Sequence, residues 1–305
     1  MKKMARIAAA LLSAVMLLTG CSANSIDPST IDYIQLRAPE EGEDIAIVDT
    51  TLGEITILLY TEEVPAIVQN FKDLVNEGFF DGQLIYQVVP TAGAAMFGSS
   101  TEDGNSPDTN TGKPIQMEYS NNLWPFSGSV CALCSEMGQL FMKKSYFDSR
   151  SFILGDMEVS DEDMASMEEN MFPAMMMNAF EEMGGVPSIS QYHTVFGKVI
   201  QGMDIVNAIQ EMEYTEFEMT EEERAEAEAE GYETAYKLTE DVIINSITLD
   251  TFRAADYETL DNTLTDEEYI DLVTRSEVEQ AEIDASIQDG TYNQEESSEE
   301  ESSKE

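Results

Sequence analysis

Two short runs of alternating apolar residues set the strongest constraint on what this chain can fold into. Ile45 and Ile47 form the first run, and the second contains Ile55, Ile57 and Leu59. Side chains two positions apart on a strand lie on the same face, and Leu52-Gly53 supplies a turn between the runs. The pattern therefore predicts a β-hairpin with one buried face.

A helix with clear boundaries follows the hairpin. Pro65 suits the first turn of a helix, and Gly78 suits the position just past a helix end. Between them lie apolar residues with the spacing of one helical stripe: Ile67, Val68, Phe71, Leu74 and Val75. This spacing is typical of a helix that covers one side of a sheet.

The rest of the middle region predicts one mainly β domain over residues 44–252. Further strands are expected at 84–90, 129–134, 150–154, 193–201 and 241–251, with a short helix at 204–211. Two helical insertions are expected, at about 155–187 and 212–238. The first contains a stripe of methionines, which is either a packing surface or a hydrophobic lid.

The beginning of the chain has the composition of a secretory signal. Lys2, Lys3 and Arg6 precede an apolar stretch too short to remain as a membrane-spanning helix. Leu18-Thr19-Gly20-Cys21 resembles the bacterial lipobox, which implies a diacyl lipid on Cys21 and a stable membrane anchor. An ordinary signal peptide is the alternative. We expect a signal at 1–20, a linker over 21–43, and an extracytoplasmic protein held at the cell membrane.

The chain is strongly acidic. It contains 61 Asp and Glu against 15 Lys and Arg, a formal net charge of -46. Such a charge repels phosphates, which excludes nucleic acid as a partner. Residues 253–305 predict an acidic helical extension whose last part is disordered, because it has too few apolar residues to offset the entropy of ordering.

The residues that usually bind zinc are scarce. The chain has one histidine and one Cys-x-x-Cys pair, too few ligands for a zinc site. Cys131 and Cys134 lie in an expected strand, where residues three apart point to opposite faces. We interpret them as core side chains, with a redox pair as the alternative. No metal and no cofactor is expected.

Five segments, taken in order, resemble the cyclophilin family. They are Asp49–Tyr60, Val64–Gly82, Glu118–Leu133, His193–Val206 and Val242–Leu249. The resemblance implies an eight-stranded antiparallel barrel capped by two helices, with a peptide groove on its outer face. It also implies peptidyl-prolyl cis-trans isomerase activity without a cofactor, with proline-containing polypeptide segments as partners.

The sequence departs from the family at the arginine thought to donate to the prolyl nitrogen. Ile85-Tyr86-Gln87-Val88-Val89-Pro90 places Gln87 at that position. Glutamine donates a neutral hydrogen bond but lacks the charge and the fork of arginine. Losing one preorganised donor commonly costs a factor of roughly 10²–10³ in rate. We therefore expect a weak isomerase; the alternative is a non-catalytic peptide-binding or chaperone-like surface lipoprotein.

Three further residues are assigned to substrate binding through the resemblance. Leu133 falls in the strand that follows Gly128. Met96 and Phe97 fall near the groove when Gly98 is aligned with a family glycine, although a place in the barrel core is equally open.

The next groove strand has two candidate segments, 138–142 and 149–153, and we prefer the second. That alignment puts Phe152 in the proline pocket and Arg150 on the groove floor. Arg150 then either supplies the missing cation or is a surface arginine paired with an acid. His193 is expected to shape the pocket without transferring a proton, with a structural histidine as the alternative.

Overall fold

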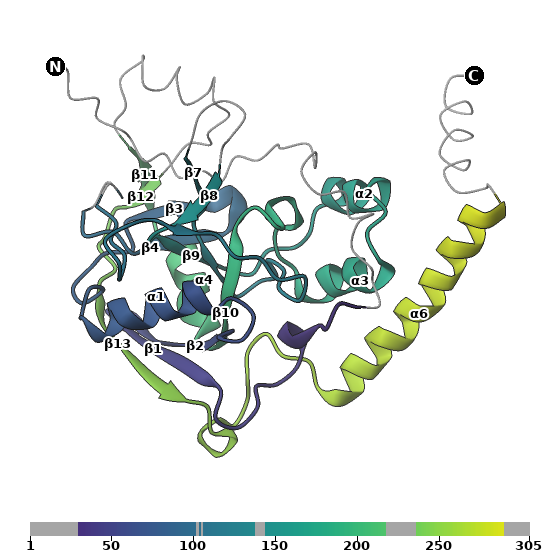
Figure 1. Cartoon of the computed structure of the whole chain (residues 1–305), viewed down its shortest axis with the longest axis horizontal. Coiled ribbons are helices and arrows are strands. Elements are labelled where there is room, and N and C mark those ends of the chain that lie inside the picture. The colour runs from purple at the N-terminus through teal and green to yellow at the C-terminus, as the bar shows by residue number, and fades with distance from the viewer. Residues whose placement is uncertain (1–29, 102–103, 105, 138–143, 218–235, 290–305) are drawn as a thin grey trace, which may run out of the picture.

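The computed structural model describes residues 30–101, 104, 106–137, 144–217 and 236–289. Within this part of the chain, ten strands form one antiparallel sheet in the order β11-β12-β3-β4-β9-β6-β10-β2-β1-β13 (Figure 1). Their bounds are β1 Asp44–Thr50, β2 Gly53–Leu59, β3 Gln87–Val89, β4 Ala94–Phe97, β6 Ser129–Ala132, β9 Ser151–Leu154, β10 Thr194–Gln201, β11 Tyr214–Glu216, β12 Tyr236–Leu238 and β13 Ile244–Thr251. The strands expected from the sequence are present with small shifts of their ends.

The predicted hairpin opens the sheet. β1 and β2 pair with Val48 opposite Ile55, and the apolar residues of both strands are buried except Ile47, which is half-buried. The hydroxyl of Thr50 accepts hydrogen bonds from the backbone nitrogens of Leu52 and Gly53, each at 3.1 Å, which closes the turn. The hairpin therefore forms where the alternation of the sequence predicts it.

The two ends of the strand series from β3 to β13 meet, which closes an eight-stranded barrel. Ile85, just before β3, donates its backbone nitrogen to the carbonyl of Val242 at 2.9 Å. Ile244, at the start of β13, donates to the carbonyl of Gln83 at 2.8 Å. β11 and β12 extend the sheet from β3 as an attached hairpin. The expected mainly β, cyclophilin-like barrel is confirmed.

Two helices cap the barrel, as expected. α1 (Pro65–Asn76) places Phe71 against Phe196 of β10, with 5.5 Å between the ring centroids. α4 (Met203–Glu211) places Val206 and Ile209 beside Phe97 at the interior of the sheet. A separate small sheet of β5 (Ile115–Gln116), β8 (Lys144–Phe147) and β7 (Ser135–Met137) was not expected.

A second apolar cluster lies beside the barrel. It joins α2 (Asp161–Glu169) and α3 (Ala174–Met183) of the first insertion to α6 (Asp266–Asp289), which lies along α3 in Figure 1. Pro173 separates α2 from α3, because proline cannot continue a helix interior. The predicted methionine stripe consists of Met164, Met167, Met171 and Met175. Met167 is buried in this cluster and Met164 and Met175 pack against it, which supports the packing interpretation, whereas Met171 is exposed.

The described part of residues 21–43 differs from the expected linker. Leu36 is buried in the second cluster, and the side chain of Gln35 donates to the carbonyl of Trp124 at 2.8 Å. These residues fold onto the body because they have apolar and amide side chains to bury. The signal segment 1–20, Cys21, most of the second insertion and residues 290–305 lie outside the described residues.

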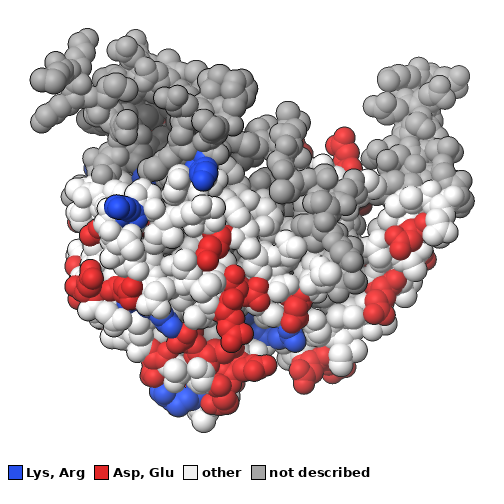
Figure 2. Space-filling model, viewed as in Figure 1, with Lys and Arg blue, Asp and Glu red and all other residues white. Residues whose placement is uncertain are grey.

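Acidic side chains predominate on the surface. Figure 2 shows Asp and Glu over the lower part of the barrel and along α6, with fewer Lys and Arg on the same face. No described helix is both long and apolar enough to cross a membrane.

Candidate active site

One row of side chains crosses three neighbouring strands on the outer face of the barrel. Gln87 of β3 lies opposite Met96 of β4, and Met96 lies opposite Phe152 of β9. Directly opposed residues in an antiparallel pair point to the same side of the sheet. β9 lies between β4 and β6, as the preferred alignment of 149–153 requires. The other candidate, 138–142, lies outside the described residues.

Phe97 does not belong to this row, so its assignment to the groove is corrected. It directly follows Met96 on β4, and successive strand residues point to opposite faces. Its ring lies 6.0 Å from that of Phe80, and it lines the barrel interior with Ile55 and Val206. Phe97 is therefore a core residue.

Gln87 is an unusual residue for a buried position. It is 1% exposed, and its amide nitrogen Nε2 has no hydrogen-bond partner within the described protein. Leaving a buried donor unpaired costs about 1–3 kcal/mol. A buried amide donor without a partner is therefore available on the face that carries Met96 and Phe152.

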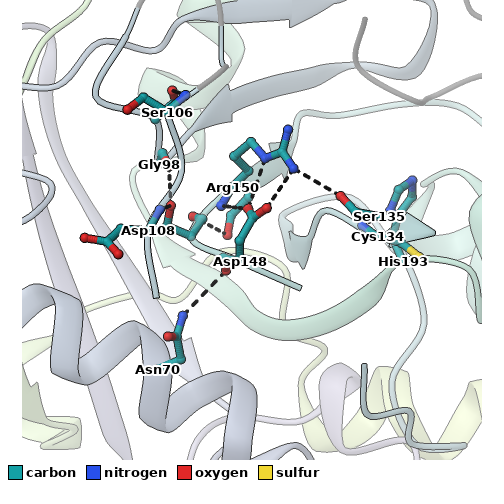
Figure 3. Close-up of polar contacts among 12 residues, drawn as sticks. Asn70, Gly98, Ser106, Asp108, Cys134, Ser135, Asp148, Arg150 and His193 are labelled. Atoms are coloured by element: carbon teal, nitrogen blue, oxygen red, sulfur yellow. Dashed lines mark hydrogen bonds and ion pairs between the residues drawn. The ribbon is translucent and has the colours of Figure 1, made fainter. Parts of the chain in front are cut away.

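Arg150 lies on the same face as Phe152, two residues earlier on the chain. Its Nε donates to Oδ1 of Asp148 at 3.0 Å, and its Nη2 donates to Oδ2 of Asp148 at 2.7 Å (Figure 3). Nη2 also donates to Oγ of Ser135 at 3.1 Å. Burial alone would lower the pKa of Arg150, but the hydrogen bonds and charge of Asp148 outweigh it and raise that pKa. The side chain is 16% exposed, so Arg150 is a paired but largely buried cation.

The segment that carries Arg150 is held from both sides. Asn70 of α1 donates to the carbonyl of Asp148 at 3.5 Å, and the Ser149 hydroxyl donates to the carbonyl of Gly98 at 2.5 Å. Asp108 donates its backbone nitrogen to the same hydroxyl at 2.9 Å. Gly98 has φ +90, and an added Cβ would lie 2.0 Å from the Ser149 carbonyl oxygen. Only glycine allows the two backbone segments to approach this closely.

His193 forms one wall beside Phe152. Its ring meets that of Phe152 edge-on, with 5.2 Å between centroids, and its Nδ1 accepts a hydrogen bond from the backbone nitrogen of Cys134 at 3.0 Å. A neutral imidazole that accepts at Nδ1 carries its proton on Nε2. Leu133 lies nearby, because its backbone nitrogen donates to the carbonyl of Arg150 at 3.0 Å.

The whole face is covered. Met96 and Phe152 are 0% exposed, and Leu133 and His193 are 4% exposed. A peptide that reaches Phe152 therefore requires movement of the segments around it.

Two residues of this region were missed by the sequence analysis. Asp148 lies two residues before Arg150. The signal available in the sequence was therefore an acidic and a basic residue two positions apart at the start of a strand, on the same face. Tyr86 is buried beside this ion pair, and burial raises the pKa of its hydroxyl, while the Arg150 and Asp148 charges act on it in opposite directions. Its ring packs against Gly104, a contact that sequence spacing gives no way to predict.

Cys131 and Cys134 are both buried, and no disulfide joins them. Burial raises the pKa of the Cys131 thiol, which keeps it protonated and unreactive. Among the described residues, no group of three or more His, Cys, Asp and Glu side chains is arranged to hold a metal ion.

Comparison with known proteins matches these observations. The sequence model of the family described as cyclophilin type peptidyl-prolyl cis-trans isomerase/CLD matches residues 45–228, which is more than half of the chain. A protein of Staphylococcus saprophyticus subsp. saprophyticus is 27% identical over 179 residues, or 58% of this chain and 87% of the relative. A protein of Staphylococcus aureus (strain NCTC 8325 / PS 47) is 26% identical over 172 residues, or 56% and 83%. The names of both relatives assign them to the peptidyl-prolyl cis-trans isomerases.

A cyclophilin type peptidyl-prolyl cis-trans isomerase of Cryptosporidium parvum covers 70% of this chain and 99% of its own, with 13% identity and a TM-score of 0.48. The same protein was also crystallised in the presence of the dipeptide Ala-Pro. On the extent of the family match, this chain belongs to the cyclophilin-type peptidyl-prolyl cis-trans isomerase family.

Proposed function

We propose that this protein isomerises Xaa-Pro bonds of extracytoplasmic polypeptides, more slowly than members of the family that carry the arginine. The observation that carries the proposal is the unpartnered amide of Gln87, buried in one row with Met96 and Phe152. A buried polar group without a partner in a folded protein is a candidate for a ligand contact.

The chemistry asks little of these residues. The barrier to rotation about a peptide bond is about 18–20 kcal/mol, because rotation breaks the double-bond character of the C–N bond. A site lowers this barrier when it binds the twisted amide better than the planar one. In our proposal Phe152 and His193 hold the proline ring, Met96 and Leu133 contact the neighbouring residues, and Gln87 donates to the twisted amide.

Arg150 is proposed as a second donor. Its hydrogen bonds to described residues use Nε and Nη2, which leaves Nη1 to bind a peptide carbonyl on the same face. The ion pair with Asp148 agrees with the interpretation that Arg150 is paired with an acid, but its burial distinguishes it from a surface arginine. Arg150 lies two residues from Phe152, so a rotating amide beside Phe152 is within reach of its long side chain.

Location outside the cytoplasm and a lipid on Cys21 are part of the proposal. They rest on the basic, apolar and small residues of segment 1–21. Mass spectrometry of the mature N-terminus tests them: a diacylated Cys21 supports the anchor, and an unmodified N-terminus or an intact signal contradicts it.

The decisive experiment removes the donor of Gln87 and keeps its volume. Gln87→Leu should lower the isomerisation rate of an Ala-Pro peptide by roughly tenfold or more, since preorganised donors commonly contribute 10²–10³. The same change should raise the free energy of unfolding by about 1 kcal/mol, because it removes an unpaired buried amide. Cis–trans exchange measured by NMR gives the rate on residues 22–305, since the described parts of both extensions pack onto the body.

The alternative function is peptide binding without catalysis, which the presence of Gln87 in place of the family arginine favours. Peptide-induced shifts of the protein's resonances, without acceleration of cis–trans exchange by the wild type or by Gln87→Leu, would establish peptide binding alone. If the peptide caused no shifts and its exchange were not accelerated, both functions would be refuted.

A further inference from the structure

A second concave site lies away from the Gln87 row, where the chain leaves β9 and meets α2 and α3. Its volume is about 670 Å³. Its walls combine methionine and acidic side chains: Met157, Met164, Met183, Asp156, Glu158, Asp161, Glu181 and Glu182, with Val159, Ser127 and Gly184. We call this site the acidic cleft.

The backbone under the acidic cleft is fixed. The carbonyl of Met157 accepts from the backbone nitrogen of Gly185 at 2.8 Å, and the nitrogen of Met157 donates to the Ser127 hydroxyl at 3.2 Å. Gly184 has φ +67, and an added Cβ would lie 2.2 Å from the Met157 carbonyl oxygen. The cleft is therefore formed before any partner arrives, and a partner does not bear the cost of ordering it.

The charge of the cleft is only partly balanced. Arg275 of α6 donates to Glu182 at 3.0 Å and lies 3.8 Å from Glu181. Glu158 and Asp161 are exposed, and no described basic side chain pairs with either. A negative rim above low-dielectric walls concentrates the field and attracts cations.

The apolar part of the cleft selects among cations. Methionine side chains are flexible and polarizable, so they adapt to apolar groups of varied shape. A small inorganic cation makes no use of such walls. A peptide segment that alternates Lys or Arg with Leu or Phe matches both the methionine walls and the acidic rim.

We propose that the acidic cleft docks cationic, apolar segments of unfolded polypeptides. A second copy of this chain is a poor occupant, because its 61 acids against 15 bases would repel the same rim. Asp156 follows Phe152 by four residues, or about 13 Å along an extended chain, so one client polypeptide reaches both sites. That last step rests on the proposed function, whereas the docking itself does not.

The test uses a proline-free probe, so that its outcome is independent of isomerisation. A fluorescent twelve-residue peptide of alternating Lys and Leu is titrated into residues 22–305 and followed by anisotropy. The double variant Glu158→Gln, Asp161→Asn should weaken binding roughly tenfold, since two partly desolvated charge contacts contribute about 1.4 kcal/mol together. The matched control Glu240→Gln, Asp241→Asn removes the same charge at another exposed place and should change binding less than about twofold.

Three outcomes would overturn the proposal. Equal weakening by both double variants would indicate general attraction to an acidic protein, and equal affinity for a Glu-Leu peptide would exclude the charge argument. Self-association of the wild type that the peptide disrupts would make a second copy the occupant. Methyl NMR gives an independent readout: Met157, Met164 and Met183 should shift on titration, and buried Met117, outside the cleft, should not.

Discussion

The side chain of Lys198 contacts both extensions from the barrel, and its replacement gives a quantitative test of what burying its charge costs. Lys198 of β10 is 2% exposed. Its Nζ donates to the carbonyl of Gln35 at 2.7 Å, to that of Asn262 at 3.1 Å and to the hydroxyl of Thr263 at 3.2 Å. A further contact reaches the carbonyl of Arg37 at 3.2 Å. Residues far apart in sequence therefore meet at one buried amine.

The expected magnitude follows from the protonation of this lysine. Burial lowers the pKa of Lys198 to about 7, with the charge of Glu43 opposing the shift, whereas an unfolded lysine has a pKa near 10.4. Above pH 7 the unfolded chain thus binds more protons at this site than the folded protein. The contribution of Lys198 to the free energy of unfolding should then rise with pH, by about 1.5–2 kcal/mol between pH 7 and 8.5. Higher pH is avoided, because the raised pKa values of Cys131 and the buried tyrosines act in the opposite direction there.

Urea unfolding of the wild type and Lys198→Met at pH 7 and 8.5 measures this slope. Methionine fills the same volume but does not titrate, so the wild type should gain about 1.5–2 kcal/mol more than the variant over that range. Lys113→Met, at an exposed lysine, is the matched control and should keep the wild-type slope. Equal slopes in wild type and Lys198→Met would refute the reasoning. They would mean that hydrogen bonds to the four oxygen acceptors offset the desolvation cost of the ammonium and leave its pKa unshifted.

Two further variants test the site. Asp148→Asn leaves Arg150 largely buried without its counter-charge and should lower the free energy of unfolding by about 2–4 kcal/mol in urea titrations. The same change at exposed Asp250, which pairs with Arg253, should have no measurable effect. Equal effects of the two changes would contradict the distinction between the buried and the exposed ion pair. Phe152→Leu should weaken binding of an Ala-Pro peptide several-fold by NMR titration, whereas Phe97→Leu, in the barrel interior, should lower stability by about 1–2 kcal/mol and leave that affinity unchanged. Loss of affinity in both would return Phe97 to the groove.

Local patterns predicted the frame of this protein well. The alternation around Ile47 and Ile57 and the boundaries at Pro65 and Gly78 each depend on neighbours within a few residues, so the sequence alone was sufficient. The same holds for the place of Phe152 on β9 opposite Met96, which needed only the alignment of one strand, whereas its contact with proline stays a prediction. Phe97 was misassigned because motif alignment ignored the alternation of side chains along β4.

The attachment of the extensions was beyond such patterns. Residues 30–37 mix polar and apolar side chains with neither the period of a strand nor that of a helix. Their buried partners, Trp124 and Lys198, are distant in sequence. A lysine in a predicted strand gives no sign that backbone carbonyls from two other segments surround it. The composition of residues 21–43 thus indicated a linker, although Gln35 and Leu36 are buried.

The replacement at position 87 and the pairing of Arg150 follow from one electrostatic constraint. The face that carries Gln87 is buried, and an unpaired charge there would cost several kcal/mol, whereas a neutral amide costs about 1–3 kcal/mol. Arg150 is tolerated on the same face because Asp148 supplies a bidentate partner at 3.0 and 2.7 Å. A covered groove can therefore retain a cation only where it also retains a carboxylate. Opening of the segments that cover this face would expose Gln87 and Arg150 together. A rate of cis–trans exchange that rises at low denaturant concentration, below the unfolding transition, would therefore identify opening as the step that limits turnover.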